Sequence, residues 1–414
     1  MAPVTLAIIG AGSRGHTYAR FAAAYPDRAK VVAVAEPREA YRSSLVEAHD
    51  IPSRNVFHDW RDVADRPRLA DAVIIATPDQ LHVEPAVAYS NLGYDILLEK
   101  PMAPNLAGCR KTVSAVKRSG VLLGVCHVLR YTAYTRELKR LIADGAIGDI
   151  VGLQRLEPVG FWHMAHSFVR GNWGNEAASG PMLLTKSCHD IDWIHHIMDQ
   201  PCEAVSSFGS LKHFRPEEAP TGAGARCLEC AVEPDCPYSA KRIYLEAVRR
   251  GRTGWPVDVL TPVPTEESVL AALAEGPYGR CVYASGNDVV DHQVVSMGFK
   301  GGRTASLTMM AFTEMGHRST EVFGTRGQIA GDGRFLHVYD FLTDQTTTID
   351  TEAGDGSILG GHGGGDYGLM DSFIRAVAEQ DQSAILSGPE ETLASHALVF
   401  AAEQARREGR VVRL

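Results

Sequence analysis

The stretch that decides the fold is Val4-Thr5-Leu6-Ala7-Ile8-Ile9-Gly10-Ala11-Gly12-Ser13-Arg14-Gly15. An apolar run with the character of a β-strand leads into glycines spaced G-x-G-x-x-G and then into a helix-like segment. In such a unit the first glycine permits a tight turn, the second lets backbone N–H groups approach a pyrophosphate, and the third lets the helix pack closely on the strand. The positive end of the helix then faces the phosphates. The stretch therefore predicts a dinucleotide site with contacts from Gly10, Gly12, Ser13, Arg14 and Gly15.

Strand-like and helix-like segments alternate through the first third of the chain. Further apolar runs occupy 31–35, 73–76 and 96–98, and the residues from Arg14 to Tyr25 have helical spacing. Because these runs are apolar throughout, they are typical of parallel strands that are covered on both faces. We expect residues 1–128 to form a Rossmann domain.

The choice of cofactor depends on Glu36, which ends the second of these runs. An acid at this position accepts both ribose hydroxyls of NAD and repels the 2′-phosphate of NADP. Arg38, two residues further on, could serve a phosphate instead. We predict NAD(H) in preference to NADP(H).

The pattern changes after about Arg130, where segments mix apolar and polar residues near a period of two. This pattern indicates antiparallel strands with one solvated or helix-covered face. The expected strands are 149–156, 204–211, 279–284, 289–298, 304–311 and 319–323. The glycine-rich segment 353–366 is expected to be an irregular loop, and helical patterns over 367–378 and 389–408 close the chain.

Composition restricts the class of partner. The formal net charge is −9, and the sequence lacks the clusters of Lys and Arg that hold a phosphate backbone. No apolar run approaches the roughly 20 residues needed to cross a bilayer, and the N-terminus lacks the features of a signal peptide. We expect a cytoplasmic protein that binds neither nucleic acid nor a membrane.

Two further motifs follow the glycine motif, namely Ala76-Thr77-Pro78-Asp79 with His82, and Leu98-Glu99-Lys100-Pro101. Together the three motifs resemble the glucose–fructose oxidoreductase and inositol dehydrogenase family (Gfo/Idh/MocA), and the likeness covers essentially the whole chain. The resemblance implies a Rossmann domain followed by an α/β domain, here 129–414, built on a large, open, mainly antiparallel sheet. C-terminal helices can pack back on the Rossmann domain. It also implies a sugar-like small-molecule substrate, a homodimer or homotetramer, and cofactor contacts from Thr77, Pro78, His82 and Glu99.

In the family, the lysine of Glu-Lys-Pro projects into the active site, which identifies Lys100 as a catalytic residue. Removing a hydride from a C–OH carbon leaves an oxygen that must lose its proton. A cation within hydrogen-bond reach stabilises the developing alkoxide or relays that proton. A lysine at this position therefore suits the chemistry.

The second catalytic candidate is His189, within the segment 185–192. The family motif has an acid four residues before a catalytic histidine and an Asp three residues after it. His189 and Asp192 match, and histidine can accept and return a hydroxyl proton near neutral pH. Thr185 stands where the upstream acid is expected. Our hypothesis is that Asp190 or Lys186 supplies the missing role.

Substrate contacts are predicted from aromatic and hydrogen-bonding residues that lie close together in the sequence. Flat apolar faces suit the C–H groups of a sugar, and Arg and His suit its hydroxyl groups or a carboxylate. A packed core explains such a cluster as well. The candidates are His166, Arg170, Trp173, Lys186 and Asp190.

A cysteine motif, C-x2-C-x5-C, lies in an irregular insertion over 212–238. Cys227 and Cys230 can bind one zinc ion together, and Cys236 nearly completes a tetrahedral site. Candidates for the fourth ligand are Cys188, Cys202, His213 and Cys281. The alternatives to structural zinc are packed thiols, a disulfide or an iron–sulfur centre.

These observations favour an NAD(H)-dependent oxidoreductase that acts on a secondary hydroxyl of a sugar, cyclitol or sugar derivative. Two alternatives remain open. One is a redox-neutral glycosidase on the same scaffold, which uses transient oxidation by bound NAD. The other is a non-catalytic nucleotide-sensing protein that has kept the fold.

Overall fold

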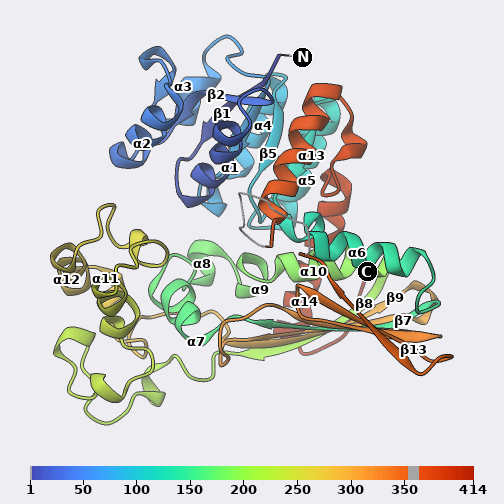
Figure 1. Cartoon of the computed structure of the whole chain (residues 1–414). Coiled ribbons are helices and arrows are strands. Elements are labelled where there is room, and N and C mark those ends of the chain that lie inside the picture. The colour runs from blue at the N-terminus through green and yellow to red at the C-terminus, as the bar shows by residue number, and fades with distance from the viewer. Residues whose placement is uncertain (1, 353–362) are drawn as a thin grey trace.

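Two sheets organise the computed structural model, which describes residues 2–352 and 363–414 (Figure 1). The first sheet is parallel, has six strands in the order β3-β2-β1-β4-β5-β6, and lies in the upper half of Figure 1. Its central strands are almost wholly buried, as their continuous apolar runs predict. The strands are β1 (Val4–Ile9), β2 (Ala29–Ala35), β3 (Val56–Phe57), β4 (Ala72–Ile75), β5 (Asp95–Leu98) and β6 (Leu123–Val125).

The second sheet has nine strands in the order β14-β13-β12-β11-β7-β10-β9-β8-β15 and lies along the bottom of Figure 1. Adjacent strands of this sheet are antiparallel, except that β10 runs parallel to β7. The predicted fold class, a Rossmann domain with a second, mainly antiparallel α/β domain, is therefore confirmed. The strands are β7 (Ile150–Pro158), β8 (Cys202–Ser210), β9 (His292–Phe299), β10 (Thr304–Met310), β11 (Ser319–Gly324), β12 (Gly327–Gly331), β13 (Phe335–Asp340), β14 (Gln345–Asp350) and β15 (Val412–Arg413).

Helices connect the strands of both sheets, and several of them lie between the two sheets (Figure 1). In the first half they are α1 (Ser13–Ala24), α2 (Glu39–His49), α3 (Trp60–Ala64), α4 (Val83–Asn91), α5 (Leu106–Ser119) and α6 (Ala133–Ala143). In the second half they are α7 (Phe161–His163), α8 (Glu176–Ser179), α9 (Met182–Thr185), α10 (Cys188–Met198), α11 (Glu246–Arg249), α12 (Glu266–Glu275), α13 (Gly365–Glu379) and α14 (Pro389–Glu408). Among the described helices, none combines the length and the apolar character that a membrane crossing requires.

The sequence pattern located most of the long strands and the helices α1, α13 and α14, but it left the other long helices unpredicted and was wrong or silent at two places in the second sheet. The segment 279–284 is not a strand, because it forms a short helical turn followed by a loop that contributes only an isolated bridge from Arg280 to Arg226. Strands β12 to β14 were not predicted, because they carry few apolar residues; Ile329, Leu336, Val338 and Ile349 pack on the core. Most of the segment 353–366 lies outside the described residues.

The two C-terminal helices connect the sheets. Helix α13 packs against α1 and β1, and Phe373 is fully buried in the apolar core of the Rossmann half. Helix α14 contacts α5 and β6 on one side and α10 and β8 on the other (Figure 1). Because α14 touches both sheets, it fixes how loops from the two halves meet.

We predict that Gly15→Ala destabilises the fold. A Cβ at Gly15 would lie 2.1 Å from the Gly10 carbonyl oxygen, so α1 would have to move away from β1. Overpacking of this kind costs about 1–3 kcal/mol, and thermal unfolding measures it. Gly254→Ala is the matched control, because a Cβ there meets no atom within 4 Å. Equal melting temperatures for the two variants would contradict the close helix–strand contact.

Candidate active site

The loops that carry the sequence motifs meet at one edge of the parallel sheet. Gly10 follows β1, Glu36 follows β2, Thr77 follows β4 and Glu99 follows β5. All of these strands are parallel, so their carboxyl ends lie at the same edge. Ligands of doubly wound sheets bind at this edge, where the strand order reverses between β1 and β4.

The glycine loop has the geometry that a pyrophosphate needs. Gly10 has φ 94°, and a Cβ there would lie 2.6 Å from the Ala76 carbonyl oxygen. At Gly12, by contrast, a Cβ would meet only an Arg38 guanidinium nitrogen, at 3.5 Å. Helix α1 has no side-chain cap at its N-terminus, and Ser13, its first residue, is exposed. The first N–H groups of α1 can therefore bind phosphate oxygens.

Glu36 is buried at the end of β2 and held in place by three groups. Its carboxylate accepts hydrogen bonds from Ala11 N at 2.9 Å, from Arg38 N at 3.0 Å and from the Arg38 guanidinium at 2.7 Å. Burial acts to raise the pKa of Glu36, but the hydrogen bonds and charge of Arg38 outweigh burial and hold that pKa below its usual value. Arg38 lies over the Tyr41 ring, 4.1 Å from its centroid. The carboxylate is thus ionised and oriented toward the glycine loop.

The other predicted cofactor residues divide into two groups. Thr77 is half-buried and Pro78 is exposed, so both remain accessible to a ligand. His82 is fully buried, with Nδ1 2.7 Å from Pro101 O and Nε2 2.9 Å from Thr77 O. It therefore joins the 76–79 loop to the 99–102 loop and does not face a ligand.

The Arg14 side chain points into the protein. Its guanidinium donates hydrogen bonds to Glu99, Asp366 and the Tyr18 hydroxyl. Burial acts to raise the pKa of Glu99, but the charges of Arg14 and Lys100 outweigh burial and hold it below its usual value. Arg14 and Glu99 thus form an ion pair that links α1, the end of β5 and α13, so only the backbone of Arg14 is placed to meet phosphate.

Lys100 reaches from the Rossmann half to the helices of the second half. Its Nζ donates a hydrogen bond of 2.7 Å to the carbonyl oxygen of Thr185, the last residue of α9. Thr185, which replaces the expected acid, thus holds Lys100 through its backbone. An ammonium group has three donors, so two remain for a substrate oxygen.

His189 is the second residue of α10 and is 7% exposed. The ring of His127 meets it edge-on, with 5.7 Å between centroids. Burial lowers the pKa of His127 to about 4, with Arg130 and Lys100 adding to the lowering and Asp192 opposing it. His127 is therefore neutral near pH 7, and a neutral ring does not repel a proton on His189.

Asp192 is fixed below His189 by a bidentate ion pair with Arg130, at 2.7 Å from both guanidinium nitrogens. Burial acts to raise the pKa of Asp192, but the charges of Arg130 and His127 outweigh it and hold the pKa well below its usual range. The Arg130 guanidinium also donates to Leu386 O, which precedes α14. This buried pair joins α10 to the 128–131 turn and to the segment before α14.

A chain of alternating charges lies beneath the predicted substrate residues. Lys186 Nζ is 3.1 Å from Glu157, which pairs with Arg318, and Arg318 and Arg155 both bind Asp190. Asp190 is fully buried with its carboxylate held by these two arginines, so it does not face a substrate. The hypothesis that Asp190 supplies the missing acid is likewise not supported by its position. Lys186, the partly exposed end of the chain, remains a candidate contact.

The other predicted substrate residues lie in two different environments. His166 is buried with its Nδ1 2.8 Å from the Tyr244 hydroxyl, and Arg170 is buried against the carbonyls of Tyr238 and Arg280, so neither faces a substrate. Trp173 remains partly exposed, and its indole N–H donates to Asp79 at 3.1 Å, which connects it to the 76–79 loop.

A further aromatic residue, Trp255, which the sequence did not single out, joins Trp162 and His163 near Lys100 and Lys186. Trp255, 45% exposed, packs against Trp162 at 5.1 Å and edge-on against His163 at 5.0 Å between centroids. Burial lowers the pKa of His163 well below its usual value, and the charges of Lys186 and Lys100 add to this. These rings therefore lie within electrostatic range of the catalytic candidates.

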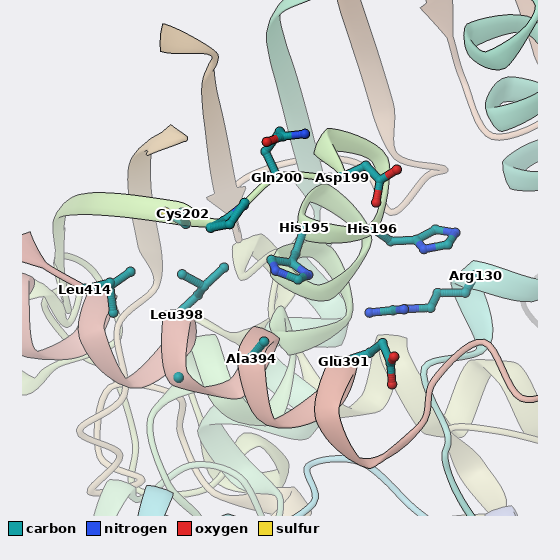
Figure 2. Close-up of a pocket in the computed structure, with 12 residues that line it drawn as sticks. Arg130, His195, His196, Asp199, Gln200, Cys202, Glu391, Ala394, Leu398 and Leu414 are labelled. Carbon is teal, nitrogen blue, oxygen red and sulfur yellow. The ribbon is translucent and has the colours of Figure 1, made fainter. Parts of the chain in front are cut away.

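A cavity of about 510 Å³ lies at the C-terminal end of α10, and neither Lys100 nor His189 lines it. His195, His196 and Arg130 face it from one side, and Glu391 and Leu398 of α14 face it from the other (Figure 2). Although it is large, it contains none of the motif residues. We therefore place the active site by the motif geometry and not by this cavity.

The three cysteines of the insertion are brought together and joined by a fourth. Cys227, Cys230, Cys236 and Cys281 line one small cavity. Within residues 2–352 and 363–414, no three Cys, His, Asp or Glu side chains are already arranged to hold a metal ion.

Comparison with known proteins agrees with this geometry. The NAD-binding Rossmann fold of an oxidoreductase family, Gfo/Idh/MocA, matches residues 4–127, and the C-terminal α/β domain of the same family matches residues 139–414. The protein therefore belongs to the Gfo/Idh/MocA family of oxidoreductases, which confirms the resemblance in the motifs. It is an oxidoreductase with an NAD-binding Rossmann domain.

Individual relatives are distant. The chain is 25% identical over 338 residues to the oxidoreductase YteT of Bacillus subtilis, covering 77% of this chain and 76% of YteT. It is 31% identical over 203 residues to an inositol 2-dehydrogenase of Streptomyces avermitilis, covering 49% of this chain and 55% of that enzyme. A solved levoglucosan dehydrogenase in complex with NADH and levoglucosan has a TM-score of 0.72 at 19% identity and covers 99% of both chains. This last likeness shows the fold.

We predict that stability falls as the pH drops from about 6.5 toward 4. Burial lowers the pKa of His127 and of His166 to about 4 and that of His396 to about 3, whereas an unfolded histidine titrates near 6.5. Between these values the unfolded chain binds protons that the folded chain does not. Each group then removes up to about 1.4 kcal/mol of stability per pH unit, and calorimetry across this range measures the loss. A melting temperature that stays constant between about pH 7 and pH 5 would contradict the neutral, buried histidines.

Proposed function

We propose that the protein catalyses the reversible oxidation of a secondary hydroxyl of a sugar, cyclitol or sugar derivative, with NAD as the hydride acceptor. The hydrogen bond from Lys100 Nζ to Thr185 O carries this proposal. It places the ammonium group of the Rossmann half at the residues that precede α10, whose second residue is His189. The cation of the Rossmann half is thus bound to a residue that precedes the proposed base by four positions in the sequence.

Each residue has a distinct role in the proposed reaction. When bound, the nicotinamide accepts a hydride from the substrate carbon. Lys100 donates hydrogen bonds to the substrate oxygen and stabilises negative charge as it develops there. His189 accepts the hydroxyl proton, and neutral His127 keeps its ring oriented without opposing its charge.

The cofactor is held by the glycine loop and by Glu36. The N–H groups at the start of α1 bind the pyrophosphate, while Thr77 and Pro78 lie along the edge of the sheet toward Lys100. The buried, ionised Glu36 carboxylate accepts hydrogen bonds from the ribose hydroxyls of NAD and repels the 2′-phosphate of NADP. It therefore supports NAD over NADP.

The substrate class is inferred from the groups around Lys100. Trp162, His163 and Trp255 offer flat faces to the C–H groups of a sugar ring, and Lys186 offers a second cation. The relatives that act on inositol and levoglucosan support a polyhydroxylated ring. We further propose a cytoplasmic homo-oligomer by analogy with the family.

The proposal is tested by following NADH formation from NAD with a panel of sugars, sugar acids, glycosides and cyclitols. Lys100→Met should lower kcat by about 100-fold or more, because it removes the charge but keeps the length of the side chain. His189→Asn should remove the acidic limb of the pH–rate profile. Lys117→Met is the matched control, since Lys117 is an exposed lysine of α5 paired with Glu390.

Three results would contradict this proposal. Full activity and an unchanged acidic limb in His189→Asn would exclude His189 as the base. Turnover of a glycoside with no net NADH, by protein that retains its NAD, would indicate redox-neutral bond cleavage. Tight NAD binding without any turnover would indicate a nucleotide sensor.

The cofactor preference gives a separate prediction. Glu36→Gln removes the charged acceptor of the ribose hydroxyls, and hydrogen bonds to charged groups contribute about 1.5–3 kcal/mol. We expect NAD affinity to fall by about 10- to 100-fold, while NADP affinity rises because Arg38 loses its partner. Titration calorimetry with each nucleotide measures both. An unchanged ratio of NAD to NADP affinity would exclude Glu36 as the selective group.

A further inference from the structure

In the folded protein a fourth cysteine, Cys281, lies beside the three cysteines of the insertion. Cys281 lies 45 residues after Cys236 in the sequence, yet both face the same cavity together with Cys227 and Cys230. An isolated β-bridge between Arg226 and Arg280 brings the two chain segments side by side, and Cys281 N donates to Ala225 O at 2.9 Å. Because Cys227 and Cys281 each follow a bridged residue, they become neighbours.

Backbone N–H groups surround the sulfur atoms. Gly224 N lies 3.3 Å from Cys230 Sγ, and Ala240 N lies 3.5 Å from Cys227 Sγ. The N–H groups of Tyr238 and Tyr283 point at the sulfurs of Cys236 and Cys281, each two residues earlier in the chain. Such donors stabilise a thiolate more than a thiol, and metal-bound thiolates are hydrogen-bonded in this way.

A buried cation faces the same sulfurs, and within residues 2–352 and 363–414 no carboxylate pairs with it. Arg170 is 4% exposed, and its Nη2 is 3.4 Å from Cys227 Sγ. Its other bonds go to carbonyl oxygens, and among the described residues Nη1 has no hydrogen-bond partner. A buried guanidinium normally lies beside a negative group. Four neutral thiols do not supply that charge, whereas thiolates do.

We propose that Cys227, Cys230, Cys236 and Cys281 bind one structural zinc ion. Zn²⁺ is held tetrahedrally by four cysteine sulfurs, and a C-x2-C pair is a common half of such a site. Binding releases the four thiol protons and leaves a Zn(Cys)4 group of charge −2, which Arg170 partly balances. The four cysteines line one cavity, and binding requires their side chains to rotate, because no three ligands within the described residues are already arranged to hold a metal ion.

The size of the cavity favours a single ion. Its volume is about 20 Å³, comparable with the space for one water molecule. A four-iron cluster needs far more room. Four protein ligands also leave no open coordination position, so the zinc is structural rather than catalytic.

The zinc connects the insertion to the wall of the active site. Arg170 ends the π-helix Met164–Arg170, which follows Trp162 and His163 of α7. Its guanidinium also binds Arg280 O and Tyr238 O, one on each side of the proposed metal site. The metal thus holds together the segments that support the proposed substrate residues. This inference does not depend on the reaction that the enzyme catalyses.

The test is elemental analysis of protein purified without added metal. We expect about one zinc per chain in the wild type and less than about 0.2 in Cys281→Ser and Cys230→Ser. Cys202→Ser is the matched control and should retain its zinc, because Cys202 lies at the start of β8 outside the cluster. A strong chelator should lower the melting temperature of the wild type by several degrees, and added zinc should restore it.

The wild-type measurement stands alone if the cysteine variants do not fold. Less than about 0.2 zinc per chain after incubation with zinc and a thiol reductant would overturn the proposal. So would iron in place of zinc, a disulfide between any two of the four cysteines in the purified protein, or full zinc content in soluble Cys281→Ser.

Discussion

The hydrogen bond from Met102 N to His396 Nε2, 3.0 Å long, joins the two halves of the protein at the point where the chemistry is proposed to occur. Met102 closely follows Lys100, and His396 belongs to α14. Since the backbone N–H is the donor, Nε2 accepts, and Nδ1 donates to Thr392 O. Burial lowers the pKa of His396 to about 3, so the imidazole is neutral and this arrangement persists at neutral pH.

The contact continues toward the second catalytic candidate. The ring of His396 lies edge-on to that of His127, 5.4 Å between centroids, and His127 lies edge-on to His189. The rings of His396, His127 and His189 thus make successive edge-on contacts that lead from the Met102 backbone to α10. Because α14 contacts α5 and β6 as well as α10 and β8, its position sets the distance between the lysine and the histidine. A shift of α14 would therefore misalign both catalytic residues, even though α14 carries neither of them.

The sequence was most informative where the chemistry is local. The strand, the glycines and the start of α1 are contiguous, so their spacing was enough to predict the nucleotide loop. Lys100 was found from a short motif. By contrast, His396 and Met102 are 294 residues apart, and Arg318 and Asp190 are 128 apart, so no spacing rule could pair them. The burial of Asp190 was missed for this reason, because its partners Arg155 of β7 and Arg318, which precedes β11, are distant in the sequence.

The cysteine motif illustrates the same limit. Spacing alone identified Cys227, Cys230 and Cys236 but left four candidates for the remaining ligand. The bridge between Arg226 and Arg280 selects Cys281, within a segment whose apolar and polar alternation had wrongly indicated a strand. Trp255 was missed because a single tryptophan in an irregular segment carries no periodic signal.

The central claim is that the nicotinamide is presented to Lys100 and His189 at the carboxyl edge of the parallel sheet. A crystal structure of the complex with NAD tests it most directly. The account predicts the pyrophosphate at the N-terminus of α1, the adenosine ribose on Glu36, and the nicotinamide ring beside Lys100 Nζ and the His189 ring. A nicotinamide ring bound away from both side chains, or an adenosine ribose that does not contact Glu36, would contradict it.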